Sequence, residues 1–344
     1  MTGDTIFELR GEYPDMADAP IWITEADVVE LINLPEAIDA LEGTLALEAG
    51  NQATSMPKTH LMVASNDAMH AIGGAASGAD ICGFKTWINV QGKSETTMTL
   101  FSTRNGACLA VIEATALGQM RTASVTGVGT KRLAPIDADH MAIIGTGKQS
   151  LPQIAAVHAV RPLKEVRVFS RNPSTRYTFA DAVTATLGVR TRGVQTLEEA
   201  VRDAPIVTLI TNSTEPFLSA DMLMNGCHLN AMGAIVPSRV EFTDDVFQRA
   251  DLIAVDSVRS VRDLSTEFRN HFKDNENAWK SVETIASLIA ENRVRPDGAD
   301  VTLYKAMGMG LSDLALAIEI FKRAQKENKG HKLPERIKFP PRLI

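Results

Sequence analysis

The amino-acid sequence predicts an α/β protein with two parts: a parallel sheet covered by helices, and an α+β part built on an antiparallel sheet. Between Asp139 and Ser257, continuous apolar segments such as HMAII, EVRVF and PIVTLI alternate with helical segments. This alternation is typical of a parallel sheet that is buried on both faces. Between Pro57 and Glu113 the segments are short and alternating, and Asn105-Gly106 lies between two of them, which indicates antiparallel strands joined by tight turns.

The segments outside these two sheets are predicted to be mainly helical. Residues 21–49 read as a short strand followed by two helices, with Thr24 as an N-cap and Pro35 in a first turn. Residues 120–133 are rich in small side chains and predict a tightly packed helix. Beyond Ser257 we expect helices only, ending in an amphipathic helix at residues 311–325.

Length and composition are those of an ordinary globular protein. The chain has 344 residues, of which 44% are hydrophobic and 22% charged, so two domains are expected. No apolar run approaches the roughly 18 residues that cross a bilayer, and the acidic start lacks the features of a signal peptide. We therefore expect a cytoplasmic protein without a membrane partner.

Charge and cysteine content exclude further classes. The net charge of −7 offers no positive field for a polyanion, so nucleic acid is not expected as a partner. The three cysteines are odd in number, widely separated and in no CxxC arrangement, which disfavours a disulfide framework and a zinc site. Motifs of hydrolases and metalloproteases, GxSxG and HExxH, are absent, and no metal is expected.

A glycine-rich turn gives the sharpest local signal. Gly145 and Gly147 follow the apolar strand HMAII directly and precede a helix, with Ser150 in place of a third glycine. Such a turn lets the backbone approach a pyrophosphate, and the helix N-terminus then faces the anion. The pattern predicts a Rossmann-type domain that binds NAD(P). Its cofactor contacts are expected at Gly145, Thr146, Gly147, Lys148 and Gln149.

The end of the next strand bears on the choice of cofactor. It reads Ser170-Arg171-Asn172 and contains no acid to accept a hydrogen bond from a free ribose 2′-hydroxyl. Arg171 can bind a 2′-phosphate, and Ser170, Asn172 and Ser174 can donate hydrogen bonds. We expect NADP(H) to be preferred, with NAD(H) possible. The alternative is that Arg171 is only a surface residue at the strand end.

Two basic residues interrupt apolar or small-residue segments: Lys85 in ICGFKTWINV and Arg121 in GQMRTASV. A lysine that faces inward on such a strand must be paired or have a lowered pKa, which makes it a candidate acid-base group. Each residue, taken alone, is also compatible with a structural salt bridge.

Taken in order, these motifs resemble one known family. FKTWINV, TTMTLFSTRNGACLAVIEA, MRTASVTGVGTKRLA, MAIIGTGKQS, EVRVFSRN, NAMGAIVPSRVEF and VTLYKAMGMGLSDLALA together resemble the ornithine cyclodeaminase and mu-crystallin family, over about residues 21–324. The resemblance implies a homodimer. It also implies a substrate-binding and dimerisation domain, expected at residues 20–129 plus 320–344, and a Rossmann domain at 130–319, with the active site in the cleft between them.

The same resemblance implies site residues. Lys85, Lys58 and Arg121 would surround the amino-acid end of the substrate, and Arg121 would bind its carboxylate. We expect Lys85 and Arg121 to line the cleft and not a core. The residues expected along the cofactor and substrate are Thr97 or its neighbour, Thr122, Thr211, Met232, Gly233, Ile235 and Met307.

Three departures from the family pattern affect the expected activity. Ile235 stands where cyclodeaminases carry an aspartate that orients and deprotonates the distal amine, so ring closure lacks its base unless another acid, such as Glu241, reaches that amine. Lys58 replaces an arginine, a point charge in place of a planar fork. Gly118 replaces a threonine that many members carry, a change the sequence alone does not explain.

We therefore predict an NAD(P)-dependent imine reductase or amino-acid dehydrogenase that acts on a small 2-imino or amino acid, with Lys85 and Arg121 as its catalytic residues. Hydride would pass between the nicotinamide and the α-carbon, and Lys85 would hydrogen-bond to the nitrogen as a proton donor or orienting group. Two alternatives stay open. One is an ornithine cyclodeaminase-type lyase, and the other is an NADPH-dependent ligand-binding protein like mu-crystallin.

Overall fold

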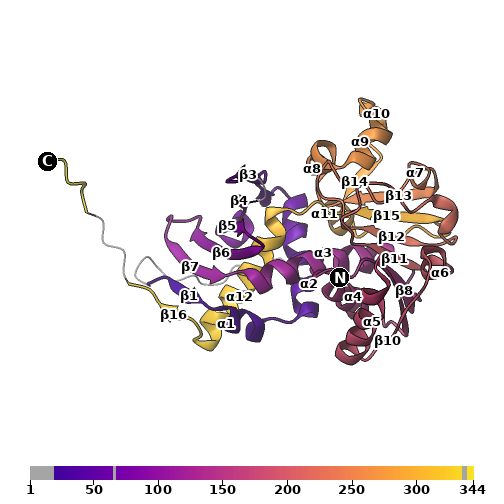
Figure 1. Cartoon of the computed structure of the whole chain (residues 1–344). Helices are drawn as coiled ribbons and strands as arrows, with labels where there is room; N and C mark the ends of the chain where they lie inside the picture. Colours follow the sequence, from indigo (N-terminus) through magenta and orange to yellow (C-terminus); the bar gives the residue numbers. More distant parts are fainter. Residues whose placement is uncertain (1–18, 65–66, 335–338) are drawn as a thin grey trace. The chain divides into compact units, whose positions relative to one another are not determined.

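The structure, a computed structural model, describes residues 19–64, 67–334 and 339–344, and it divides the chain into two compact units (Figure 1). The first unit comprises residues 1–33, 50–118 and 309–344, and the second comprises residues 34–49 and 119–308. Each unit contains one eight-stranded sheet. The expected domain boundaries at 129 and 319 differ from these limits and stay a prediction.

The sheet of the first unit is mostly antiparallel, as the sequence predicts. Its strands run in the order β16-β1-β7-β6-β5-β4-β2, with β3 also paired to β4, and only β1 and β7 are parallel. Three of these strands, β2, β4 and β16, were not expected from the sequence. The strand bounds are β1 (Ile21–Ile23), β2 (Ala53–Ser55), β3 (Thr59–Met62), β4 (Ala68–Ala76), β5 (Ile81–Val90), β6 (Lys93–Ser102), β7 (Cys108–Glu113) and β16 (His331–Lys332).

Two helices complete the first unit. Helix α1 (Glu25–Leu31) begins with a capping box in which Thr24 and Asp27 satisfy each other's backbone groups, which confirms Thr24 as the N-cap. Helix α12 (Gly310–Glu327) packs against β2, β4 and β5 and is buried along most of its length. An acid or a lysine at this packed surface must therefore find a partner inside the unit.

Glycines permit the close approach of α12 to the sheet. An added Cβ on Gly310 would lie 1.8 Å from the carbonyl oxygen of Gly73, and one on Gly74 would lie 3.5 Å from the backbone nitrogen of Leu311. The backbone of β4 and the first turn of α12 are thus in direct contact. Side chains at these positions would force the helix away from the sheet.

All eight strands of the second sheet are parallel, as predicted for this part of the chain. The order is β10-β9-β8-β11-β12-β15-β13-β14. The prediction of helices only beyond Ser257 is wrong, because β14 and β15 lie there and β15 pairs between β12 and β13. The strand bounds are β8 (His140–Ile144), β9 (Glu165–Phe169), β10 (Arg190–Gly193), β11 (Ile206–Leu209), β12 (His228–Ala231), β13 (Ala250–Val255), β14 (Val282–Thr284) and β15 (Val301–Lys305).

Helices follow most of these strands and bury two apolar clusters against the sheet. Within the described residues, no helix is both long enough and apolar enough to cross a membrane. Helix α3 begins in the first unit and continues in the second. The helix bounds are α2 (Leu34–Ala49), α3 (Thr115–Leu133), α4 (Ser150–Val160), α5 (Pro173–Leu187), α6 (Leu197–Val201), α7 (Val246–Arg249), α8 (Val258–Leu264), α9 (Thr266–Phe272), α10 (Glu276–Trp279) and α11 (Ile285–Ala290).

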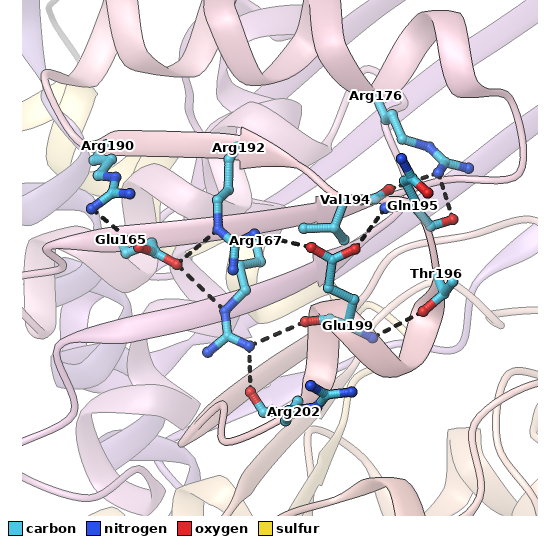
Figure 2. A network of polar contacts seen from close by, with 10 residues as sticks. All are labelled: Glu165, Arg167, Arg176, Arg190, Arg192, Val194, Gln195, Thr196, Glu199 and Arg202. Atoms are coloured by element: carbon cyan, nitrogen blue, oxygen red, sulfur yellow. Dashed lines mark hydrogen bonds and ion pairs between the residues drawn. The ribbon is translucent and has the colours of Figure 1, made fainter.

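A polar network ties the edge of the parallel sheet to α6 (Figure 2). The carboxylate of Glu165 lies 3.2 Å from Nε of Arg192 and 3.5 Å from Nε of Arg167. Arg192 also reaches Glu199 on α6 at 3.1 Å, and Arg167 donates to the carbonyl oxygen of Glu199 at 3.2 Å. Since the carboxylates are partly exposed, these ion pairs add little stability individually. Together they fix the position of β10 at the sheet edge.

We predict that Gly310→Ala lowers the free energy of unfolding by about 3 kcal/mol, because the new methyl group overlaps the backbone of Gly73 and neither partner is a flexible side chain. Urea denaturation followed by circular dichroism measures the change. Gly43→Ala in α2 is the control: its Cβ meets no atom within 4 Å and should stabilise by up to about 1 kcal/mol through helix propensity. Equal stability of Gly310→Ala and wild type would contradict the described packing.

Candidate functional site

A buried ion pair occupies the face of the first sheet that α12 covers. Lys85 on β5 is 4% exposed and Asp313 on α12 is fully buried, with 2.5 Å between Nζ and Oδ1. Burial of two charges requires close pairing, and the two residues are 228 positions apart in the sequence. The structure therefore corrects the expectation that Lys85 stays outside a core. Its ammonium group is held by a carboxylate inside the unit.

Two ammonium groups lie within contact distance of the indole ring of Trp87. The Nζ atom of Lys85 is 5.0 Å from the centre of the indole ring, and Nζ of Lys58, in the loop before β3, is 5.4 Å from it. Both distances fit cation–π contacts. The structure thus brings together Lys58 and Lys85, two of the site residues expected from the N-terminal part, around an aromatic side chain that the sequence analysis did not nominate.

Gly118, in the first turns of α3, faces Lys85. A Cβ at this position would lie 3.7 Å from Nζ of Lys85, which is an ordinary van der Waals distance. A threonine here would place its side chain against the ammonium group. The departure noted in the sequence thus concerns a position directly beside the Lys85 ammonium group.

Thr97 lies on the other face of the same sheet. It pairs with Thr86 across β5 and β6, and the two hydroxyl oxygens are 3.3 Å apart. Because side chains alternate along a strand, Thr86 and Thr97 point away from the face of Lys85 and Trp87. The neighbour of Thr97 that shares the face of Lys85 is Thr96, paired with Trp87.

In the second unit, the glycine-rich turn has the geometry of an anion cradle. Gly145 has a φ of +120°, and a Cβ there would lie 2.4 Å from the carbonyl oxygen of Ile210. Gly147 has no atom within 4 Å of an added Cβ, so its backbone is open to a ligand. Oε1 of Gln149 and the hydroxyl of Ser150 are buried and have no hydrogen-bond partner among the described residues. The turn and the N-terminus of α4 fit a dinucleotide pyrophosphate.

The side chains just after β9 differ in whether other protein groups already bind them. Asn172 caps α5 by accepting from the backbone N–H of Ser174, and the Ser170 hydroxyl lies 3.1 Å from that of Thr175. Thr146 also donates to Thr175. Arg171 is exposed, and no described residue binds its side chain. Among the residues just after β9, Arg171 is therefore the cationic side chain that can bind a phosphate.

Arg176 on α5 holds this loop in place. Its guanidinium donates to the carbonyl oxygens of Val194 at 2.6 Å and Gln195 at 2.8 Å (Figure 2). It also donates to the carbonyl oxygen of Ser170, and it lies over the ring of Phe169, 4.6 Å from the ring centre. Since the side chain is buried and both terminal nitrogens donate to backbone carbonyls, Arg176 is a structural residue and not a rival of Arg171 for a ligand.

Glu241 organises the loops at the carboxyl ends of β11 and β12. Its fully buried carboxylate accepts hydrogen bonds from the backbone N–H groups of Thr211, Gly233 and Ala234 at 2.7–3.0 Å, and from the Thr211 hydroxyl at 2.8 Å. Four donors saturate a carboxylate. Both oxygens of Glu241 are thus engaged by backbone N–H groups and the Thr211 hydroxyl, which disfavours Glu241 as a replacement for the missing aspartate.

The residues around Glu241 are buried with it. Glu267 accepts from the backbone N–H of Glu241 at 3.1 Å and lies 3.8 Å from Nζ of Lys305, at the end of β15. Ile235 is half-buried and packs on the apolar core, and Met232 is buried. The loops bearing Thr211, Met232, Gly233 and Ile235 are thus held by an acidic and basic network beneath them.

Asp256 is a second buried acid, and it holds the turn of Met307 and Gly308 that lies beside Arg121. Oδ2 of Asp256 accepts from the backbone N–H groups of Met307 at 2.9 Å and Gly308 at 2.7 Å. An added Cβ on Gly308, whose φ is +91°, would lie 3.1 Å from a guanidinium nitrogen of Arg121. The Arg121 guanidinium therefore rests on a turn that Asp256 fixes. Thr122, the next residue, accepts a hydrogen bond from Gln153 through its carbonyl oxygen.

Glu48 on α2 belongs to the same buried region. Desolvation and, secondarily, the charge of Asp256 raise the pKa of Glu48 to about 7. Burial likewise raises the pKa of Tyr304, with smaller contributions from Asp256 and Glu48. One oxygen of each of these three residues is buried without a hydrogen-bond partner among the described residues. Ionisation of Glu48 therefore adds an unfavourable charge to this region.

We predict that Glu48→Gln stabilises the protein at pH 8 and not at pH 4.5. A carboxyl whose pKa is higher in the folded than in the unfolded chain loses stability as the pH rises from its ordinary value of 4.5 to about 7, and the amide removes this loss. The gain should be about 2–3 kcal/mol. Urea unfolding at both pH values measures it, with the exposed Glu198→Gln as control. A pH-independent difference would contradict the assignment.

Several functional candidates were missed by the sequence analysis: Trp87, Asp256 and Asp313. A signal existed for Asp313, since it is a lone acid in the apolar helix GLSDLALA, as Lys85 is a lone base in an apolar strand. Two lone opposite charges in buried segments predict a pair. Asp256 ends the apolar strand DLIAVD, where a parallel sheet commonly carries ligand-binding groups.

Comparison with known proteins agrees with this geometry. The Delta(1)-pyrroline-2-carboxylate reductase of Bacillus cereus is 30% identical to the chain over 232 residues, which are 66% of this chain and 70% of that protein. The alanine dehydrogenase of Archaeoglobus fulgidus is 26% identical over 324 residues, which are 90% of this chain and 97% of that protein. A solved archaeal alanine dehydrogenase dimer with bound NAD is 25% identical with a TM-score of 0.83, over 92% of this chain and 99% of that one.

The family assignment rests on nearly the whole chain. The ornithine cyclodeaminase/mu-crystallin family matches residues 20–328, which include every strand but β16 and all the site residues described above. The chain therefore belongs to the ornithine cyclodeaminase/mu-crystallin family.

Proposed function

We propose that this protein is a nicotinamide-dependent imine reductase, or amino-acid dehydrogenase, that acts on a small 2-imino or amino acid. The observation that carries the proposal is the buried Lys85–Asp313 pair, an ammonium group held at a fixed place next to Trp87. The relatives named as pyrroline-2-carboxylate reductase and alanine dehydrogenase support it, since both names describe chemistry between an α-carbon and a nitrogen.

In this proposal, Lys85 binds and protonates the substrate nitrogen. Its ammonium donates a hydrogen bond to the imine nitrogen and delivers the proton that the amine product needs. Asp313 keeps the lysine charged in a buried place and limits its position, so that the proton is available at one atom. The nicotinamide, when bound, supplies the hydride that reaches the α-carbon.

The remaining residues bind and orient the substrate and the cofactor. Arg121, held on the Met307–Gly308 turn, presents a planar fork to the substrate carboxylate, and Lys58 adds a point charge. The turn Gly145–Gln149 receives the pyrophosphate, and the backbone around Thr211, Met232 and Gly233, fixed by Glu241, lines the nicotinamide end. Holding the reactants in one geometry supplies several kcal/mol of the acceleration.

Cyclodeamination is disfavoured by the described side chains. Ring closure needs a base for the distal ammonium, whose unperturbed pKa is about 10.4. Ile235 offers no acceptor, and Glu241 is saturated by backbone donors. The reductase is therefore preferred over the lyase.

A homodimer is proposed through the outer face of the first sheet. Leu61, Met69, Phe84 and Ile88 share this face and are 40–62% exposed, and Met62 and Val63 at the end of β3 are also exposed. Exposed apolar side chains gathered on one surface are typical of an interface. The solved archaeal relative is a dimer, which supports a second copy of this chain as the occupant.

NADP(H) is the proposed preferred cofactor, with NAD(H) possible. Arg171 is exposed and unengaged within the described residues, and the strand end carries no acid. A relative of known structure holds NAD, so the preference for the 2′-phosphate rests on Arg171 of this chain alone.

We predict that the double variant Lys85→Met/Asp313→Asn lowers kcat for imine reduction by about 10²–10⁴-fold, because it removes the proton donor. The double change avoids the buried, unpaired carboxylate that Lys85→Ala alone would leave. NADPH oxidation is followed by absorbance with 2-oxo acids plus ammonia and with cyclic imines such as pyrroline-2-carboxylate. Circular dichroism and cofactor binding check the fold.

Lys93→Met, on the exposed β5–β6 hairpin, is the matched control and should keep wild-type turnover. Near-normal kcat in the folded double variant would remove Lys85 from the chemistry. Absence of reduction with every imine tested in the wild type would reject the reductase proposal itself.

We predict that Arg171→Asp raises the Kd for NADPH at least about tenfold and lowers the Kd for NADH, because a carboxylate repels the 2′-phosphate and accepts from the ribose hydroxyl. Fluorescence titration with both cofactors measures the two affinities. Arg259→Asp, an exposed arginine on α8, is the control. Equal affinity of the wild type for NADPH and NADH would contradict the role of Arg171.

A further inference from the structure

Lys305, the last residue of β15, is a buried lysine to which the proposed function gives no role. Its side chain is fully buried, and its Nζ has no hydrogen-bond partner among the described residues. Oε1 of Glu267 on α9 lies 3.8 Å from this Nζ, and the carboxylate of Glu267 is buried too. A charge inside a protein is strongly unfavourable without an opposite charge beside it, so the two side chains compensate each other.

Glu267 connects this lysine to Glu241. Its Oε1, the oxygen that faces Lys305, also accepts a hydrogen bond from the backbone N–H of Glu241 at 3.1 Å, and its Oε2 accepts from the Ser265 hydroxyl at 2.8 Å. Both glutamates are buried, and like charges repel each other strongly where little water screens them. The ammonium group beside Glu267 offsets this repulsion.

Glu241 in turn holds residues 210–213, which follow β11, and residues 232–235, which follow β12. We call these two segments the backbone loops. Oε1 of Glu241 accepts from the backbone N–H of Thr211 at 2.7 Å, and Oε2 accepts from that of Gly233 at 2.9 Å. An added Cβ on Gly233 would lie 2.3 Å from the backbone nitrogen of Thr211, so the loops are in direct contact. A shift of Glu241 therefore displaces both loops.

We propose that Lys305 is a positioning residue of the cofactor site, whose ammonium group keeps Glu267 and Glu241 in the arrangement that fixes the backbone loops. This rests on the proposed function, in which the backbone loops line the nicotinamide end of the cofactor. All of these residues belong to the second unit. Lys305 acts through Glu267 and touches neither substrate nor cofactor. The loops require its charge and not its bulk.

The first test needs no ligand. Lys305→Met keeps an unbranched side chain and removes the charge, so amide hydrogen exchange of the backbone loops should become at least about tenfold faster, while peptides of α5 keep wild-type rates. Lys305→Met/Glu267→Gln removes both charges and should return loop exchange to within about threefold of the wild type. Lys164→Met, in an exposed ion pair with Asp139, is the matched control and should change neither.

The second test measures cofactor binding. NADPH and NADH are compared with ADP-ribose, which carries the pyrophosphate but no nicotinamide. Lys305→Met should raise the Kd of the two cofactors at least about tenfold and that of ADP-ribose less than about threefold, because only the nicotinamide end meets the backbone loops. The double variant should bind all three nearly as the wild type does.

Wild-type loop exchange in a folded Lys305→Met, or equal damage in the single and double variants, would overturn the proposal. If the single variant does not fold, the double variant decides: wild-type loop exchange supports the role of charge balance, and fast exchange contradicts it. A wild type that binds the cofactors but reduces no imine would reject the reductase and leave the role of Lys305 intact. Absence of cofactor binding by the wild type would reject both.

Discussion

The buried pair of Lys85 and Asp313 is the constraint on which the first unit depends. A lysine in the interior is tolerated only with a close opposite charge, so β5 and α12 must keep Nζ and Oδ1 in contact. Gly74 and Gly310 allow this, because they let the helix approach the sheet backbone. The packing that satisfies the pair also places the ammonium beside Trp87, where the proposed chemistry needs it.

In the second unit, two buried acids, Glu241 and Asp256, bind mainly backbone N–H groups. Glu241 gathers the loops after β11 and β12, and Asp256 gathers the turn after β15. Each carboxylate replaces water for N–H groups that a loop would otherwise leave unsatisfied. These loops are at the carboxyl edge of a parallel sheet, where ligands of such folds bind. In the proposed function, the backbone that these acids fix provides the cofactor contacts.

Sequence analysis recovered the elements whose pattern is local. The strands of the parallel sheet up to Val255 and the capping box at Thr24 follow from apolar periodicity and capping chemistry. It missed β4, because AMHAIGGAA lacks the usual alternation, and β15, because a fully buried VTLYK pairs with distant strands. Lys85 was nominated from its apolar surroundings. Its partner required the tertiary structure, since 228 residues separate the two side chains.

The most direct measurement follows a deuterium atom placed at C4 of the reduced nicotinamide, on the hydrogen that is transferred, during incubation with a 2-oxo acid and ammonia. Mass spectrometry of the amino-acid product should show one deuterium at the α-carbon for each cofactor oxidised. Release of ammonia from an added diamino acid, with the label retained on a cofactor that is not consumed, would contradict the account and indicate a lyase.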